Sequence, residues 1–248
     1  ISVTRLIEQY ANEFDSEGMA EKVANKENRS IEDVLAEWKY KADFACKKGS
    51  TCHEYAQCLW NGKLWKPLYF DHSIEFRKAK LSIITQAMNF KNDYESHLEH
   101  LIDELPIGSE EFDIASCVDH LFYNKLTGEV VLVDYKTNSY MSGYNKKAYS
   151  KKMKVPLNHL NDDALHHYYI QLSIYKYLIE TYTHLKIGEM FIVYMSENIE
   201  NYEIIEIPYL EKEVKKILEN RRVKKMKSVP VLLIGKSGSG KSASLRNF

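Results

Sequence analysis

The alternation of apolar and polar positions predicts a helical first third of the chain. Ser30 followed by Asp33, ahead of an apolar run, is typical of a helix N-terminus. A second helix is expected to begin after Gly49 and to end near residue 61, where Asn-Gly follows. A third helix is expected between residues 83 and 98.

The middle of the chain changes to strand-like periods. Residues 101–107 alternate between apolar and polar side chains, and residues 112–124 and 129–138 are rich in β-forming residues. The intervening NKLTG at 124–128 is a turn signal that contains a glycine. These two runs are therefore predicted to form a β-hairpin.

Helical spacing returns after a predicted loop at 138–158. A helix is expected over 162–182, because its apolar stripe recurs every three to four residues at Leu165, Tyr168, Leu172, Tyr175 and Ile179. Two strands are expected at 189–196 and 202–208, followed by a basic helix at about 210–227. This order of elements predicts an α/β or α+β fold with a mixed central sheet flanked by helices.

Composition is that of an ordinary globular chain. Of 248 residues, 44% are hydrophobic and 28% are charged, which argues against a disordered protein. The longest apolar run, near 231–234, is far shorter than the roughly 18 residues that a membrane helix needs. Polar residues interrupt the first ten positions, so we expect no signal peptide, no membrane association and a cytoplasmic protein.

Charge and cysteine content narrow the partners. The chain has 34 Lys+Arg against 35 Asp+Glu, so a highly charged partner must be bound by local patches rather than by the whole molecule. Its four cysteines lack CxxC spacing, which favours reduced thiols over a disulfide scaffold.

A carboxylate–lysine group on the predicted hairpin is the main candidate for chemistry. Asp134 and Lys136 lie two apart on one strand and therefore share a face. If the hairpin turns at 124–128, Asp119 lies opposite or diagonal to Asp134, close enough for both carboxylates to hold one divalent ion. Glu104, on the preceding strand, could supply a third oxygen. Taken alone, a D-x-K pair is as a rule a surface ion pair at a strand end.

The surroundings of Asp134 favour a metal over a surface pair. The four apolar residues 130–133 precede it, and a charge that ends such a run is costly to bury unless it is paired or bound to a metal. Carboxylates with one lysine suit metal-assisted phosphodiester hydrolysis, in which the metal polarises the phosphate and activates water. Lys136 can then position that water or stabilise charge on the phosphate.

Four segments in register resemble a known family. The chain resembles the RecB-like branch of the PD-(D/E)xK nuclease superfamily, and within it the phage and prophage exonucleases, over most of residues 45–225. The resemblance implies a restriction-endonuclease-like mixed sheet with an extra N-terminal helical region. The segments that carry it are GSTCH (49–53), SCVDHL (116–121), VDYKT (133–137) and QLSIY (171–175).

The resemblance also implies roles for single residues. It implies Mg²⁺ as the cofactor, with Mn²⁺ able to substitute. The catalytic residues that it implies are Glu104, Asp119, Asp134, Lys136, Gln171 and Tyr175, and the implied metal ligands are His53, Glu104, Asp119 and Asp134. Some relatives carry an iron–sulfur cluster on C-terminal cysteines, but no cysteine follows Cys117, so no such cluster is expected.

Some alternatives stay open at this level. Ser116 stands where the family often has glycine, and Glu110 or Glu111 could take the place of Glu104. His53 alone would more often be a packed or surface histidine. Gln171 and Tyr175 flank an apolar stripe and are equally compatible with ordinary helix packing.

A lysine-rich stretch follows the D-x-K strand. Its lysines could neutralise phosphates and its tyrosines could stack on bases, although a solvated loop would show the same pattern. The candidate DNA-binding residues there are Tyr144, Lys146, Lys147, Lys151 and Lys152.

The last residues contain a phosphate-binding pattern. GKSGSGKS at 235–242 satisfies G-x4-G-K-[ST], so Gly240, Lys241 and Ser242 are candidate phosphate-binding residues. Only six residues follow Ser242, too few for a complete ATPase. We therefore expect a nuclease domain over 1–227 and an incomplete ATPase fragment, of the phage type, over 228–248.

Together these patterns predict a divalent-metal-dependent deoxyribonuclease, an exonuclease of phage or prophage recombination and repair. The alternatives are a non-catalytic nucleic-acid-binding module and the N-terminal part of an ATP-driven DNA-processing motor. The expected partners are DNA, a recombination partner or ATPase domain, and further copies of this chain. The residues leave open exo or endo cleavage, polarity, DNA or RNA, and one or two ions.

Overall fold

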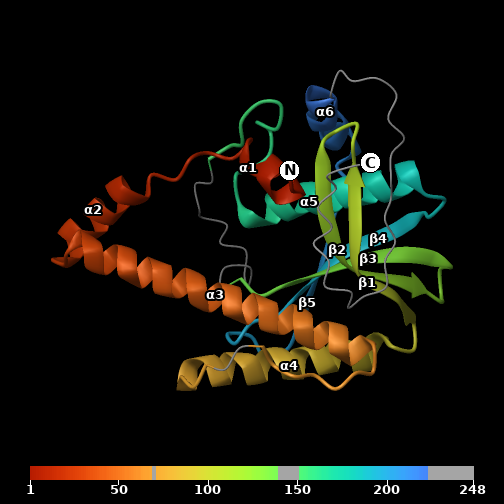
Figure 1. Ribbon diagram of the computed structural model, residues 1–248, viewed down its shortest axis with the longest axis horizontal. Coiled ribbons are helices and arrows are strands. Elements are labelled where there is room, and N and C mark those ends of the chain that lie inside the picture. The colour runs from red at the N-terminus through yellow and green to blue at the C-terminus, as the bar shows by residue number, and fades with distance from the viewer. Residues whose placement is uncertain (69–70, 139–150, 223–248) are drawn as a thin grey trace, which may run out of the picture.

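The structure is a computed structural model that describes residues 1–68, 71–138 and 151–222. Helices and strands are arranged in layers around one sheet (Figure 1). The helices are α1 (Val3–Glu8), α2 (Ser16–Glu27), α3 (Ile31–Trp60), α4 (Ile74–Tyr94), α5 (Ala164–Tyr182) and α6 (Glu211–Arg221). The strands are β1 (Leu98–Ser109), β2 (Ile114–Asn124), β3 (Glu129–Lys136), β4 (Ile187–Tyr194) and β5 (Glu203–Glu206).

The sheet has five strands in the order β1-β2-β3-β4-β5. Neighbouring strands are antiparallel except for β3 and β4, which are parallel. The chain passes through α5 between these two, because parallel strands need a crossover connection. The predicted mixed sheet with flanking helices and N-terminal helices is therefore confirmed, in the restriction-endonuclease-like arrangement.

Helices cover both faces of the sheet. In Figure 1, α3 and α4 lie on one side, and α5 lies on the other with α1 and α6. β3 alternates between the two cores: Val131 and Val133 pack toward α3 and α4, whereas Leu132 packs toward α5. A central strand buried on both faces explains the unbroken apolar run that precedes Asp134.

The helix expected to begin after Gly49 is wrong in its start. α3 is one helix of 30 residues that runs through Gly49, with the Ser30 hydroxyl accepting from the Asp33 amide at 3.0 Å. Gly49 lies where the helix crosses the end of β3, and a Cβ built there would be 3.8 Å from Thr137 Oγ1. Tertiary packing thus outweighs the low helix propensity of glycine. The predicted end is confirmed, because the helix ends at Trp60 and Gly62 follows with φ +62°.

α4 begins earlier than expected, at Ile74, and ends at Tyr94. Ser73 caps it, with its hydroxyl accepting from the Phe76 amide at 3.2 Å. Buried apolar residues recur with helical spacing from Phe76 to Phe90, so the face that packs on the sheet continues well before residue 83. No helix among the described residues combines the length and apolar character needed to cross a membrane.

An arm projects from the layered body. α2 and the N-terminal half of α3 extend away from the sheet (Figure 1). They pack on each other through a small cluster in which Ala20, Ala24 and Val34 are buried. This arm cluster is separate from the cores on the two faces of the sheet.

Candidate active site

The regular alternation of side chains between the two faces of the sheet is interrupted at Glu104 in β1 and at Asp119 in β2. Residues two apart on a regular strand share a face. Here Asp103 contacts Gln57 of α3 and Asn61 just after that helix, whereas Leu105 belongs to the core on the α5 side. The backbone of Glu104 has φ +47°, in the left-handed region that is costly for residues other than glycine.

The same change occurs on β2 and marks the end of its pairing with β3. His120 packs against Tyr135 on the α3 side, whereas Val118 belongs to the core on the α5 side. The paired residues of β2 and β3 end with His120 opposite Val133. Continued by one position, this register would place Asp119 opposite Asp134, one of the two placements (opposite or diagonal) expected from the sequence. Both aspartates therefore lie where β2 parts from β3.

Asp134 and Lys136 form a buried ion pair on the α5 side of β3. The Lys136 ammonium lies 2.5 Å from Asp134 Oδ2, and the residue Asp134 is 1% exposed. The same ammonium lies 4.8 Å from the centre of the Tyr168 ring of α5. Lys136 is thus held between a carboxylate and an aromatic face.

α3 brings His53 to the other aspartate. His53 Nδ1 lies 3.2 Å from Asp119 Oδ2. The imidazole also packs edge-on against Tyr135, with ring centres 6.4 Å apart. The site is therefore assembled from the sheet and one helix: β3 supplies Asp134 and Lys136, β2 supplies Asp119, and α3 supplies His53.

The two carboxylates differ in their electrostatics. Burial raises the pKa of Asp134 to about 7, and the charge of Asp119 adds to this rise while Lys136 opposes it. Burial would also raise the pKa of Asp119, but the attraction of His53 holds it below its usual range. Burial alone would lower the pKa of Lys136, yet Asp134 keeps it above the ordinary value.

One oxygen of each aspartate is suited to a cation. Asp119 Oδ2 and Asp134 Oδ2 are buried atoms, and the basic groups beside them are His53 Nδ1 at 3.2 Å and Lys136 Nζ at 2.5 Å. Buried carboxylate oxygens are costly unless they are paired or bound to a metal, and such hard oxygens are the ligands that Mg²⁺ and Mn²⁺ prefer. The donor set therefore fits a divalent cation.

A protein cage around such an ion is absent from the described residues, where no three His, Cys, Asp or Glu side chains gather as a metal site. Mg²⁺ is commonly held by one or two carboxylates, with waters and substrate phosphates completing its octahedron. Glu104 is next to Asp119 in the β1–β2 register, between the pairs Asp103–His120 and Leu105–Val118, but its side chain is exposed. The role of Glu104 as a third ligand stays a prediction.

Gln171 and Tyr175 belong to a hydrogen-bonded chain behind the site. Gln171 Nε2 donates to Tyr175 Oη at 2.8 Å, and Ser116 Oγ lies 3.1 Å from the same oxygen. Burial raises the pKa of Tyr175 to about 12, and the charges of Asp134 and Asp119 add to the rise. Tyr175 is also part of the α5-side core, so packing and proximity to the carboxylates coexist in one side chain.

The remaining predicted residues fall outside this site or outside the described chain. Lys152 donates to Asn161 Oδ1 at 2.7 Å and to the carbonyl of His159, and Lys151 is exposed beside it. The other predicted residues lie outside the described residues: Tyr144, Lys146, Lys147, Gly240, Lys241 and Ser242.

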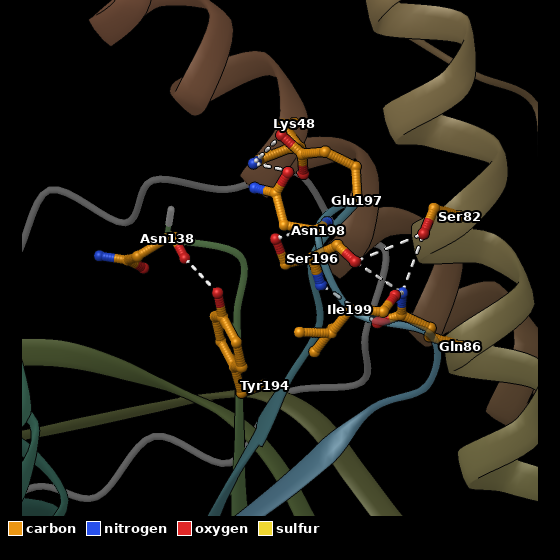
Figure 2. A network of polar contacts seen from close by, with 9 residues as sticks. All are labelled: Lys48, Ser82, Gln86, Asn138, Tyr194, Ser196, Glu197, Asn198 and Ile199. Carbon is orange, nitrogen blue, oxygen red and sulfur yellow. Dashed lines mark hydrogen bonds and ion pairs between the residues drawn. The ribbon is translucent and has the colours of Figure 1, made fainter. Parts of the chain in front are cut away.

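Two further features were missed at the sequence level. Tyr168 was counted only as part of an apolar stripe, although it precedes Gln171 by three positions and Tyr175 by seven and so shares their helix face. The second is a buried ion pair between Lys48 and Glu197 at the end of β4, drawn in Figure 2. Two lysines before Gly49 and an acid after a strand give no signal that Lys48 and Glu197 meet.

Comparisons with known proteins are sparse. No protein-family model matches the chain, and no curated protein is similar to it. A solved structure from Eubacterium rectale, described as a putative exonuclease, is similar over 71% of this chain with 18% identity and a TM-score of 0.45. The chain spans 64% of that protein's length. The structure of SSO0001 is similar over 57% of this chain and 58% of its own, with 16% identity and a TM-score of 0.33. Any function must therefore be argued from the residues of the site.

Proposed function

We propose that this protein is a divalent-metal-dependent deoxyribonuclease that acts as an exonuclease. The observation that carries the proposal is the pair of buried aspartate oxygens, Asp119 Oδ2 and Asp134 Oδ2, where the pairing of β2 with β3 ends. A lysine lies against one of them and a histidine against the other. The order of motifs that resembles the RecB-like nucleases supports DNA as the substrate.

In this proposal each side chain has a separate task. Asp119 and Asp134 would hold Mg²⁺, which supplies charge neutralisation at the scissile phosphate and an acidified water. Lys136 places its ammonium beside that phosphate and stabilises the charge that develops on its oxygens. His53 orients the carboxylate of Asp119 through the contact of 3.2 Å.

The hydrogen-bonded chain of α5 has a supporting task. The Tyr175 hydroxyl lies 3.1 Å from Ser116 Oγ and can donate to it, on the same strand as Asp119. Gln171 donates to that hydroxyl oxygen and fixes its orientation. The Lys136 ammonium, held by Tyr168 and Asp134, keeps one position when substrate enters.

The proposal is tested with end-labelled linear duplex DNA and a covalently closed circle of the same sequence. We expect Mg²⁺-dependent release of nucleotides from the linear substrate only. Asp134→Asn should abolish this release, because the ion loses one carboxylate. The matched control is Glu206→Gln, which changes an exposed carboxylate on β5 and should retain full activity.

Equal digestion of the circle would contradict an exonuclease and leave an endonuclease. Cleavage by Asp134→Asn at the wild-type rate would show that the proposed metal site takes no part in the reaction. DNA binding without cleavage in the wild type, at any concentration of Mg²⁺ or Mn²⁺, would identify a non-catalytic binding module.

A further inference from the structure

We propose that Lys48 and Glu197 are a positioning pair, which fixes α3 on the sheet so that His53 meets Asp119. The inference rests on the proposed function, because it assigns this pair a part in the same site. Neither residue contacts the aspartates directly. Their effect passes through the helix that carries His53.

The ion pair is buried on the lysine side and bidentate. Lys48 is 2% exposed, and its ammonium lies 3.0 Å from Glu197 Oε1 and 2.8 Å from Oε2. Figure 2 shows the lysine side chain reaching from α3 to the segment that follows β4. Burying an ammonium group is costly, and an apolar side chain of similar volume would often stabilise the fold equally well at such a position.

The segment that carries Glu197 is itself held in place. Gln86 of α4 donates to the carbonyls of Ser196 at 2.7 Å and of Ile199 at 3.2 Å, and its side-chain oxygen accepts from the Ser196 amide at 3.1 Å. Figure 2 shows these bonds on both sides of Glu197. A carboxylate on a segment fixed in this way is a firm anchor for a helix.

One and a half turns of α3 cross the ends of three strands. Lys48 bonds the segment after β4, and Cys52 Sγ lies 3.9 Å from Met195 Sδ in the same segment. Gly49 passes the end of β3 close to Thr137, and His53 reaches Asp119 of β2. The Cys52 thiol is a weak donor and the Gly49 contact is non-directional. On the C-terminal side of His53, the helix is held by hydrogen bonds from Gln57 to Asp103 and from Trp60 to Tyr135. The bidentate pair is the directional restraint on the N-terminal side of His53, so that the helix is fixed on both sides of that residue.

A small displacement of α3 is enough to separate His53 from Asp119. A shift by one residue turns a helix by about 100° and moves it about 1.5 Å along its axis. Even a displacement near 1 Å at a reacting centre can reduce a rate by about 100-fold. The pair therefore acts on catalysis through geometry rather than through its own charge.

The test separates positioning from stability with four variants. Lys48→Met removes one partner, Lys48→Met/Glu197→Met removes both, and Lys48→Arg retains a cation. Replacing both members of a buried pair by apolar residues commonly restores stability. The matched control is Lys215→Met, which removes the exposed pair with Glu211 on α6.

The first readout is the ¹⁵N-histidine spectrum of the metal-free protein, recorded below the melting transition of each variant. His53→Gln assigns the His53 signals, and Asp119→Asn provides the spectrum of a His53 without its carboxylate. We expect the His53 signals of Lys48→Met and of the double variant to move toward those of Asp119→Asn. Those of Lys48→Arg and Lys215→Met should stay in place.

The second readout is the kinetics of Mg²⁺-dependent DNA digestion. We expect kcat to fall about 10- to 100-fold in Lys48→Met and in the double variant, with KM little changed and with recovery in Lys48→Arg. Unmoved His53 signals in the double variant would overturn the positioning role, whatever its stability. Moved signals in a protein that never cleaves DNA would uphold the contact and reject the proposed nuclease instead.

Discussion

The ammonium group of Lys136 is held by three neighbours of different chemistry. Asp134 pairs with it at 2.5 Å, the Tyr168 ring covers it at 4.8 Å, and the charge of Asp119 also acts on it. The two carboxylates, which are the proposed metal ligands, attract the ammonium, and the ring limits its movement away from them. The position of the charge at the phosphate thus depends on the ring as well as on the carboxylates.

Replacing Tyr168 by Leu should therefore lower kcat of the proposed nuclease by about 3- to 30-fold, the value of one cation–π contact. Tyr168→Phe keeps the ring and should remain close to wild type. Steady-state digestion of labelled DNA measures the difference, and thermal melting followed by circular dichroism checks the fold. Equal losses in the two variants would assign the effect to the hydroxyl group and not to the ring.

Metal binding can be examined without any substrate. A ligand that binds only the folded state raises its stability, so Mn²⁺ should raise the melting temperature of the wild type in a concentration-dependent way. Asp119→Asn and Asp134→Asn should each lose most of this rise, whereas Glu206→Gln on β5 should keep it. Calorimetric or dye-based melting with and without a chelator measures this. An unchanged Mn²⁺ response in both aspartate variants would place the ion elsewhere.

At this scale the sequence predicted the contacts that depend on local geometry. The spacing of Asp134 and Lys136 places them on one face of β3, and the turn length sets the register that ends at His120 and Val133, the neighbours of Asp119 and Asp134. The pair of Lys48 and Glu197 could not be predicted in this way, because its partners are 149 positions apart. Long-range pairs depend on how α3 docks, which no local pattern encodes.

Replacing glycine by alanine is expected to have opposite effects on stability in the helix α3 and in the β1–β2 hairpin. In α3, Gly49 has room for a methyl group, since an added Cβ meets only Thr137 Oγ1 at 3.8 Å. In β1, an added Cβ at Gly108 would lie 2.7 Å from the Ile114 carbonyl oxygen of β2. Backbone atoms cannot move aside as a flexible side chain can.

We expect Gly49→Ala to stabilise the protein by about 0.5–1 kcal/mol through helix propensity. Gly108→Ala should destabilise it by about 1–3 kcal/mol through overpacking. Urea denaturation of both variants, with the midpoint and slope compared with wild type, measures the two signs. A destabilised Gly49→Ala would mean that α3 and β3 approach each other more closely than the structure indicates.

The elements that were predicted well are those with a single clear period. The apolar stripe of 162–182 predicted α5, and the hairpin predicted β2 and β3 within a few residues of their ends. The predicted helix start after Gly49 is wrong because glycine, with its low helix propensity, does not interrupt α3. Its low propensity is outweighed by the docking of α3 across the ends of β3 and β4.

The layered body and the projecting arm differ in how much apolar surface holds them. The two faces of the sheet each bury a large cluster, whereas the arm cluster buries only Ala20, Ala24 and Val34. Local unfolding of the arm should therefore need less free energy than global unfolding. The sequence predicted helices in the first third of the chain, but it could not predict that half of α3 extends beyond the sheet.

Val34→Ala should accelerate amide hydrogen exchange in residues 16–46 and leave the exchange of β2, β3 and β4 unchanged. Leu132→Ala, in the α5-side core, should instead lower global stability by about 2–5 kcal/mol and raise exchange throughout. Hydrogen exchange followed by mass spectrometry, together with urea denaturation, distinguishes the two patterns. Uniformly faster exchange in Val34→Ala would show that the arm and the body unfold as one unit.

The parting of β2 from β3 bears on which ions the site can admit. Paired strands are kept about 4.8 Å apart by their backbone hydrogen bonds, which would impose one gap between opposing carboxylates. In the described chain this pairing ends at His120 and Val133, one position before the aspartates. Pairing between β2 and β3 therefore does not fix the gap between Asp119 and Asp134, although Asp134 stays paired with Ile192 of β4. Discrimination between cations of different radius then depends on the side chains that restrain each carboxylate rather than on hydrogen bonds between β2 and β3.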